Sequence, residues 1–113
     1  MVPVQPLLLT LKNMIYTQLT PDYKYDTLAE AIYAREVEYF HYDFDRNNFQ
    51  HLINAVPDGE FKISTAERLA STMQQMDVVK AVIAALRSQI DDQQAYATAV
   101  ERVTARRKAK EAL

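Results

Sequence analysis

The chain has 113 residues, of which 49% are hydrophobic and 25% charged, and its formal net charge is −2. These proportions are ordinary for a folded globular domain, so they exclude a chain that is disordered throughout. There is no cysteine, which excludes disulfides, cysteine-ligated metal centres and thiol nucleophiles. The single glycine, Gly59, excludes glycine-rich phosphate-binding loops.

The scarcity of turn-forming residues indicates the fold class. Besides Gly59 there are only four prolines, whereas β proteins need many turns. We therefore expect one all-α domain of three or four helices. Residues 1–61 are predicted to form an N-terminal helical pair, and residues 62–113 a long or bent C-terminal helix.

In the N-terminal part, the prolines set the expected boundaries. Residues 1–6 are predicted to be non-helical, with Pro6 starting a first helix over Leu7–Leu19. Pro21 is expected to end that helix and to leave a loop before a cap at Asp26 or Thr27. The first helix carries an apolar row at steps of three and four residues: Leu8, Leu11, Ile15 and Leu19.

A second helix is expected from about Leu28 to Ala55, with a possible bend at Asp43–Asn48, and Pro57 to Gly59 should end it. It contains two apolar rows, as does a helix that lies between two neighbours. One row is Ile32, Tyr39, Tyr42, Phe49, Ile53 and Val56. The other, which we call the aromatic row, is Tyr33, Val37, Phe40 and Phe44. Burial of both rows is the simpler interpretation; the alternative is that one of them is a recognition face.

After Gly59, an extended segment at Phe61–Ile63 and a capping box at Ser64–Glu67 are predicted to start the last helix. Positions at heptad spacing follow, and eight of these eleven are apolar. They are Leu69, Thr72, Met76, Val79, Ile83, Leu86, Ile90, Gln93, Ala97, Val100 and Thr104, which we call the heptad row. An unbroken or merely bent helix from Thr65 to Ala112 is favoured, with a fold-back at Ser88–Gln93 as the alternative. Such a helix is too long for so small a core, so we expect a partner to cover it.

The predicted partner-binding residues are therefore apolar side chains of the heptad row, together with three aromatic side chains of the preceding helix. They are Leu69, Met76, Val79, Ile83, Leu86, Ile90, Val100, Tyr39, Tyr42 and Phe49. The partner is expected to be a second copy of the chain or another helical protein.

Two weaker sites remain open. Residues 62–113 carry nine basic against six acidic side chains, and the excess lies near the C-terminus at Arg102, Arg106, Arg107 and Lys108. These are candidates for contacts with nucleic-acid phosphates, although solvated cations at a helix end explain them as well. Glu38 and His41 have the spacing found in di-iron helical bundles, but such bundles need two copies. The only metal-site hypothesis that we keep is a metal ion shared between subunits, and we expect no cofactor.

No run of about 18 apolar residues occurs and no signal peptide is recognisable, so we expect no membrane span and a cytoplasmic location. The sequence thus predicts a non-enzymatic helical interaction or assembly protein that self-associates. The composition is also typical of accessory and phage-encoded proteins. A nucleic-acid-associated regulator and a metal-binding helical oligomer are the alternatives.

Overall fold

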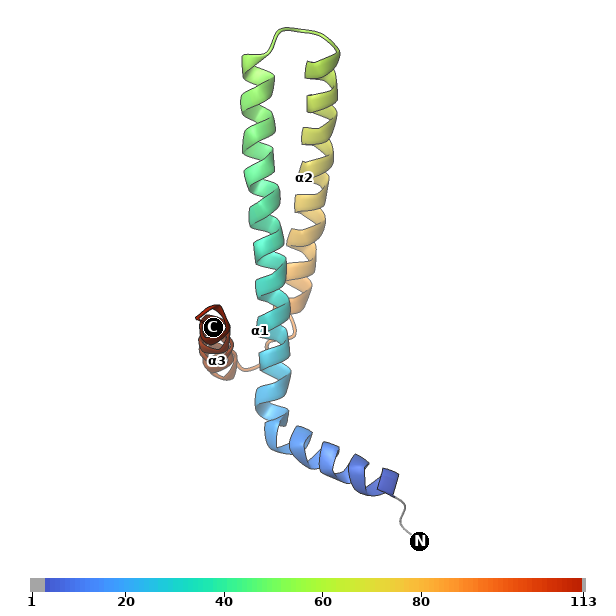
Figure 1. Cartoon of the computed structure of the whole chain (residues 1–113), viewed down its shortest axis with the longest axis vertical. Coiled ribbons are helices and arrows are strands. Elements are labelled where there is room, and N and C mark those ends of the chain that lie inside the picture. Colours follow the sequence, from blue (N-terminus) through green and yellow to red (C-terminus); the bar gives the residue numbers. More distant parts are fainter. Residues whose placement is uncertain (1–3, 113) are drawn as a thin grey trace. The chain divides into compact units, whose positions relative to one another are not determined.

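The computed structural model describes the backbone of residues 4–112 and the side chains of residues 24–112. That part of the chain forms three helices and no strand, namely α1 (Val4–Ala55), α2 (Glu60–Arg87) and α3 (Gln93–Glu111) (Figure 1). The predicted all-α fold with a long C-terminal helix is confirmed. The chain divides into two compact units. The first unit joins the chain up to Ala31 with the chain from Ile90 on, and the second unit is Ile32–Gln89.

α1 is one helix where the sequence predicted a helical pair, and the predicted loop before Asp26 is wrong. Val4 to Pro6 are helical because the first N–H groups of a helix have no intrahelical partner, so Pro6 costs little there. Pro21 lies inside α1. Tyr25, Leu28 and Ala29 beyond it are buried, and burial of an apolar face outweighs one lost backbone bond.

α1 continues as helix through Asp43–Asn48, where the sequence left a bend open, and Arg46 pairs with Asp43 at 2.7 Å along the helix. The apolar row predicted at Leu8, Leu11, Ile15 and Leu19 lies outside the described side chains.

The connection between α1 and α2 lies where the sequence placed it, from Val56 to Gly59. Gly59 has φ 154°, a conformation that side-chain-bearing residues rarely adopt, so glycine is required for this chain reversal. α2 begins at Glu60, and the predicted extended segment and Ser64 cap are therefore wrong. Thr65 lies inside the helix and donates its hydroxyl hydrogen to the carbonyl of Phe61 at 2.7 Å.

The favoured unbroken helix over residues 65–112 is wrong as well, because the chain leaves helical geometry between Ser88 and Asp92, near the alternative break. Asp92 is extended, and its carboxylate accepts a hydrogen bond of 3.1 Å from the N–H of Ala95. This side-chain cap starts α3 without a glycine. The neighbouring Asp91 accepts a hydrogen bond from Tyr25.

In the second unit, the later part of α1 and α2 run antiparallel beside each other (Figure 1). The side chains between them recur at steps of three, four or seven residues and are buried or half-buried. From α1 they are Ile32, Tyr39, Tyr42, Phe49, Ile53 and Val56, and from α2 Thr65, Leu69, Thr72, Met76, Val79, Ile83 and Leu86. Each helix of this hairpin thus covers the apolar row of the other.

Two adjacent valines of α2 test this packing as a matched pair. Val79 is 3% exposed and Val78 is 57% exposed. We expect Val79→Ala to lower the free energy of unfolding by about 2 kcal/mol relative to Val78→Ala, because only Val79 loses buried methyl groups. The gain in helix propensity is common to both variants and cancels. Equal urea denaturation midpoints for the two variants would contradict the observed register.

Candidate interaction surfaces

The heptad row of α2 faces α1 of the same chain. Met76 and Val79 are buried, and Leu69, Ile83 and Leu86 are half-buried. The predicted partner-binding residues of α1 lie opposite and are half-buried too: Tyr39, Tyr42 and Phe49. The structure therefore brings these eight predicted residues together within one chain, as cover for one another.

The two remaining predicted partner-binding residues belong to the first unit. Ile90 is half-buried, whereas Val100 on α3 is 37% exposed. The part of the heptad row that lies on α3 is thus the part that keeps an exposed large apolar side chain.

Among the described side chains of α1, those from residue 24 on, the aromatic row carries the most exposed apolar residues. Its members follow steps of four, three and four residues, and this register places them on the side of α1 opposite the α2-facing row. Phe40 is 66% exposed and Phe44 59% exposed. The Phe40 ring meets the His41 ring edge-on at 6.3 Å between centroids, and both line a shallow hollow with Phe44 and Asp45. The two rows of α1 therefore differ: the row that faces α2 is buried or half-buried, whereas Phe40 and Phe44 of the aromatic row are exposed.

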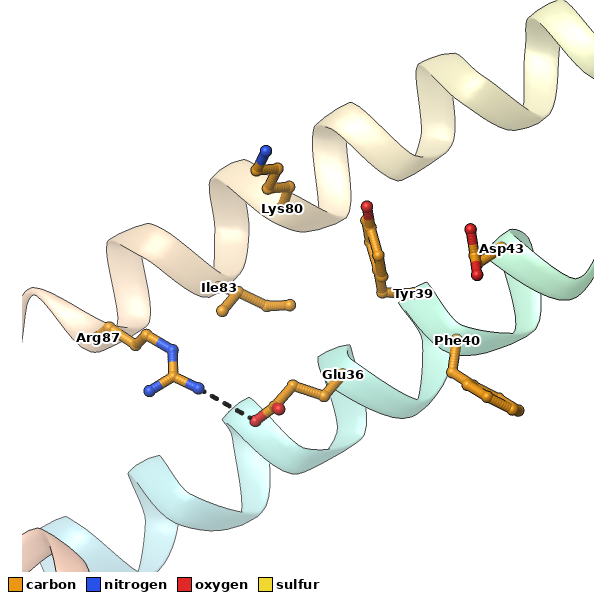
Figure 2. A pocket seen from close by; sticks show the side chains of 7 residues that line it. All are labelled: Glu36, Tyr39, Phe40, Asp43, Lys80, Ile83 and Arg87. Atoms are coloured by element: carbon orange, nitrogen blue, oxygen red, sulfur yellow. Dashed lines mark hydrogen bonds and ion pairs between the residues drawn. The ribbon is translucent and has the colours of Figure 1, made fainter. Parts of the chain in front are cut away.

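A groove of about 490 Å³ runs between α1 and α2 in the second unit (Figure 2). Figure 2 shows Tyr39 and Ile83 extending between the helices, whereas Phe40 points away from α2. Arg87 and Glu36 form an ion pair of 3.3 Å at its edge. Both side chains are about half exposed, so this pair contributes little stability.

The basic cluster of α3 is largely engaged in the first unit. Arg102 donates two hydrogen bonds, of 3.2 and 2.8 Å, to one oxygen of Asp26, and Arg106 donates to the other. The Asp26 side chain is only 17% exposed. Two of the four candidate phosphate-binding residues thus pair with a carboxylate that the sequence assigned to helix capping. Arg107 is half-buried and Lys108 is exposed.

A second polar contact of the first unit joins α1 to the start of α3. The Tyr25 hydroxyl donates a hydrogen bond to Asp91, and the Lys24 ammonium lies 3.4 Å from the same carboxylate. The hydrogen bond to Asp91, together with burial, raises the pKa of Tyr25 from 10.0 to about 12. The same bond lowers the pKa of Asp91, as does the positive charge of Lys24.

The metal candidates lie apart from other ligands. Glu38 pairs with Arg35 at 3.0 Å, and His41 is exposed beside Phe40. Among the described side chains, no three His, Asp or Glu gather as the ligands of one metal ion would. None of the three helices, in their described residues, combines the length and the hydropathy needed to span a bilayer.

The chain shows no match to any protein-family model, to any curated protein or to any solved structure compared with it.

The pairing of Asp26 with two guanidinium groups predicts a local loss of stability in Asp26→Asn. We expect the amide protons of α3 to exchange faster, with an opening free energy about 1–2 kcal/mol lower, because Arg102 and Arg106 lose the charge of the largely buried Asp26 carboxylate. Hydrogen exchange measured by mass spectrometry checks this. Asp77→Asn is the control, since Asp77 is exposed on α2. If hydrogen exchange in α3 is unchanged in Asp26→Asn, the ion pairs with Asp26 do not stabilise the position of α3.

The raised pKa of Tyr25 predicts a pH dependence of stability. The unfolded chain releases this proton near pH 10, whereas the folded chain keeps it until about pH 12. The contribution of the contact is therefore complete below pH 10 and is lost as the pH rises from 10 to 12. Tyrosinate absorbance during titration should show one late-ionising phenol that Tyr25→Phe removes. If Tyr25→Phe still shows a phenol that ionises late, the raised pKa belongs to another tyrosine.

Proposed function

We propose that this chain is a non-enzymatic helical interaction protein whose partner helix packs on the aromatic row of α1. The observation that carries the proposal is the exposure of Phe40 and Phe44, each more than half accessible on the side of α1 opposite α2. A buried phenylalanine contributes about 1.5–3 kcal/mol relative to an exposed one, so a partner gains by covering both rings.

The spacing of the aromatic row favours a helix as the partner. Steps of four, three and four residues along one helix face present a straight apolar strip, which another helix can pack against in a coiled-coil-like manner. Acidic side chains flank this strip at Glu30 and Asp45. Their charge disfavours nucleic-acid phosphates at this surface, and the pairing of Arg102 with Asp26 removes support for such contacts elsewhere.

Self-association is the form of interaction that we propose. The chain is dipolar, since residues 1–61 carry four basic and nine acidic side chains and the remainder carries nine and six. Opposite charges at the two ends favour contact between copies. Association through the heptad row between Leu69 and Leu86 stays a prediction, and it requires opening of the α1–α2 hairpin, whereas the aromatic row is accessible without any rearrangement.

Solution mass tests the proposal. Light scattering after size exclusion should give at least a dimer for the unmodified chain and a monomer for Phe40→Asp combined with Phe44→Asp. The helical content measured by circular dichroism should stay unchanged, because both side chains are exposed. Phe61→Asp is the matched control: Phe61 is 60% exposed on α2, and its replacement should leave the oligomer intact.

A monomeric unmodified chain at high micromolar concentration would contradict self-association. Equal oligomerisation of the double variant and the control would remove the aromatic row as the contact surface.

A further inference from the structure

We propose that the groove between α1 and α2 binds an amphipathic organic anion of the class of a medium-chain carboxylate. Its carboxylate lies at Lys80 and Tyr39, and its apolar chain lies over Ile83. The groove has a volume of about 490 Å³ and belongs entirely to the second unit. Small-molecule sites have volumes of this order and combine apolar walls with a few polar groups. The inference does not depend on self-association through the aromatic row.

The charge balance of the groove favours an anion. Two acidic and two basic side chains line it, namely Glu36, Asp43, Lys80 and Arg87. Glu36 pairs with Arg87 at 3.3 Å, and Asp43 pairs with Arg46 at 2.7 Å. Each acid therefore already has a cation as its partner. Lys80 is exposed and forms no ion pair with any residue of the described part of the chain, so its positive charge is left over.

A hydroxyl group on the opposite wall adds a second donor for the same anion. Figure 2 shows the Tyr39 ring extending from α1 toward α2, with its hydroxyl at the α2 side of the groove. Within residues 24–112 this hydroxyl has no hydrogen-bond partner. The Lys80 ammonium sits on a flexible four-carbon stem and carries three N–H donors. A carboxylate between the two helices can accept hydrogen bonds from both groups, and the bond from the ammonium is charge-assisted.

The apolar part of the groove requires that the anion carry a chain. Ile83 is half-buried and extends between the helices near the Tyr39 ring, and the Glu36–Arg87 pair lies at the edge (Figure 2). Lys80 and Arg87 are seven residues apart, which is about 10 Å along α2. Because carbon–carbon bonds are about 1.5 Å long, an extended chain of about eight carbons covers this distance. An inorganic anion would leave the apolar side chains in contact with water, so the groove fits a carboxylate with an alkyl chain better.

Titration of the full chain with decanoate at neutral pH tests the inference. Two-dimensional NMR of backbone amides, below the concentration at which decanoate forms micelles, should show saturable shifts at Tyr39 and Ile83. The dissociation constant should lie below about 1 mM. Lys80→Gln removes the charge and Tyr39→Phe removes only the hydroxyl, and each should weaken binding at least about threefold. Lys108→Gln is the matched control, because Lys108 is an exposed lysine of α3 and its replacement should leave binding unchanged.

Two further probes separate the head group from the chain. Decylammonium, which has the same chain with a positive head, should bind at least about threefold more weakly than decanoate, and acetate should cause no shift at the same concentrations. Circular dichroism verifies that Lys80→Gln is folded. The inference is overturned if decanoate gives no saturable shift in the groove, if decylammonium binds equally well, or if Lys80→Gln binds like the control. Groove shifts that depend on protein concentration without any probe would also overturn it, because a second copy would then cover the groove.

Discussion

The packing of α2 on the later part of α1 is the interaction on which the second unit depends. Each helix carries an apolar row at steps of three and four residues, and each row is removed from water only because the other helix lies against it. The chain reversal requires Gly59, whose φ of 154° suits no other residue well. Once α2 occupies one side of α1, the aromatic row must lie on the other side, where Phe40 and Phe44 are exposed.

Charge has a different role in the first unit, where it attaches α3 to α1. Asp26 accepts hydrogen bonds from Arg102 and Arg106, so one carboxylate holds two guanidinium groups beside the buried Ala99 and Val103. Tyr25 and Lys24 hold Asp91 at the start of the same helix, and Asp92 caps it. Basic residues that suggest a phosphate-binding tip in the sequence thus serve an internal ion-pair network. The cations left at the end of α3, Lys108 and Lys110, are the ones accessible to an acidic surface.

α1 contributes residues to both units. In the second unit it has one apolar row turned toward α2 and another turned away from it. A long helix with two apolar faces is stable in water only when both are covered or when the uncovered one is short. The aromatic row spans about three turns and combines two exposed phenylalanine rings with acidic flanks. This combination is the observation on which the proposed function rests.

The sequence by itself determined the helical class, the reversal at Pro57 to Gly59, and the two rows of α1, because these follow from local periodicity and from residues with strong backbone preferences. It misplaced the boundaries at Pro21 and Ser64 and favoured an unbroken helix across Ser88. At these places a local preference of a few kcal/mol or less competes with burial that only the folded chain provides. It identified the heptad row but not the helix that packs against it. The pattern of apolar side chains in the sequence is the same whether they pack against the same chain or against another chain. Only the tertiary structure decided that α1 covers the row of α2 and that Asp26 neutralises Arg102, because both contacts join residues far apart in the chain.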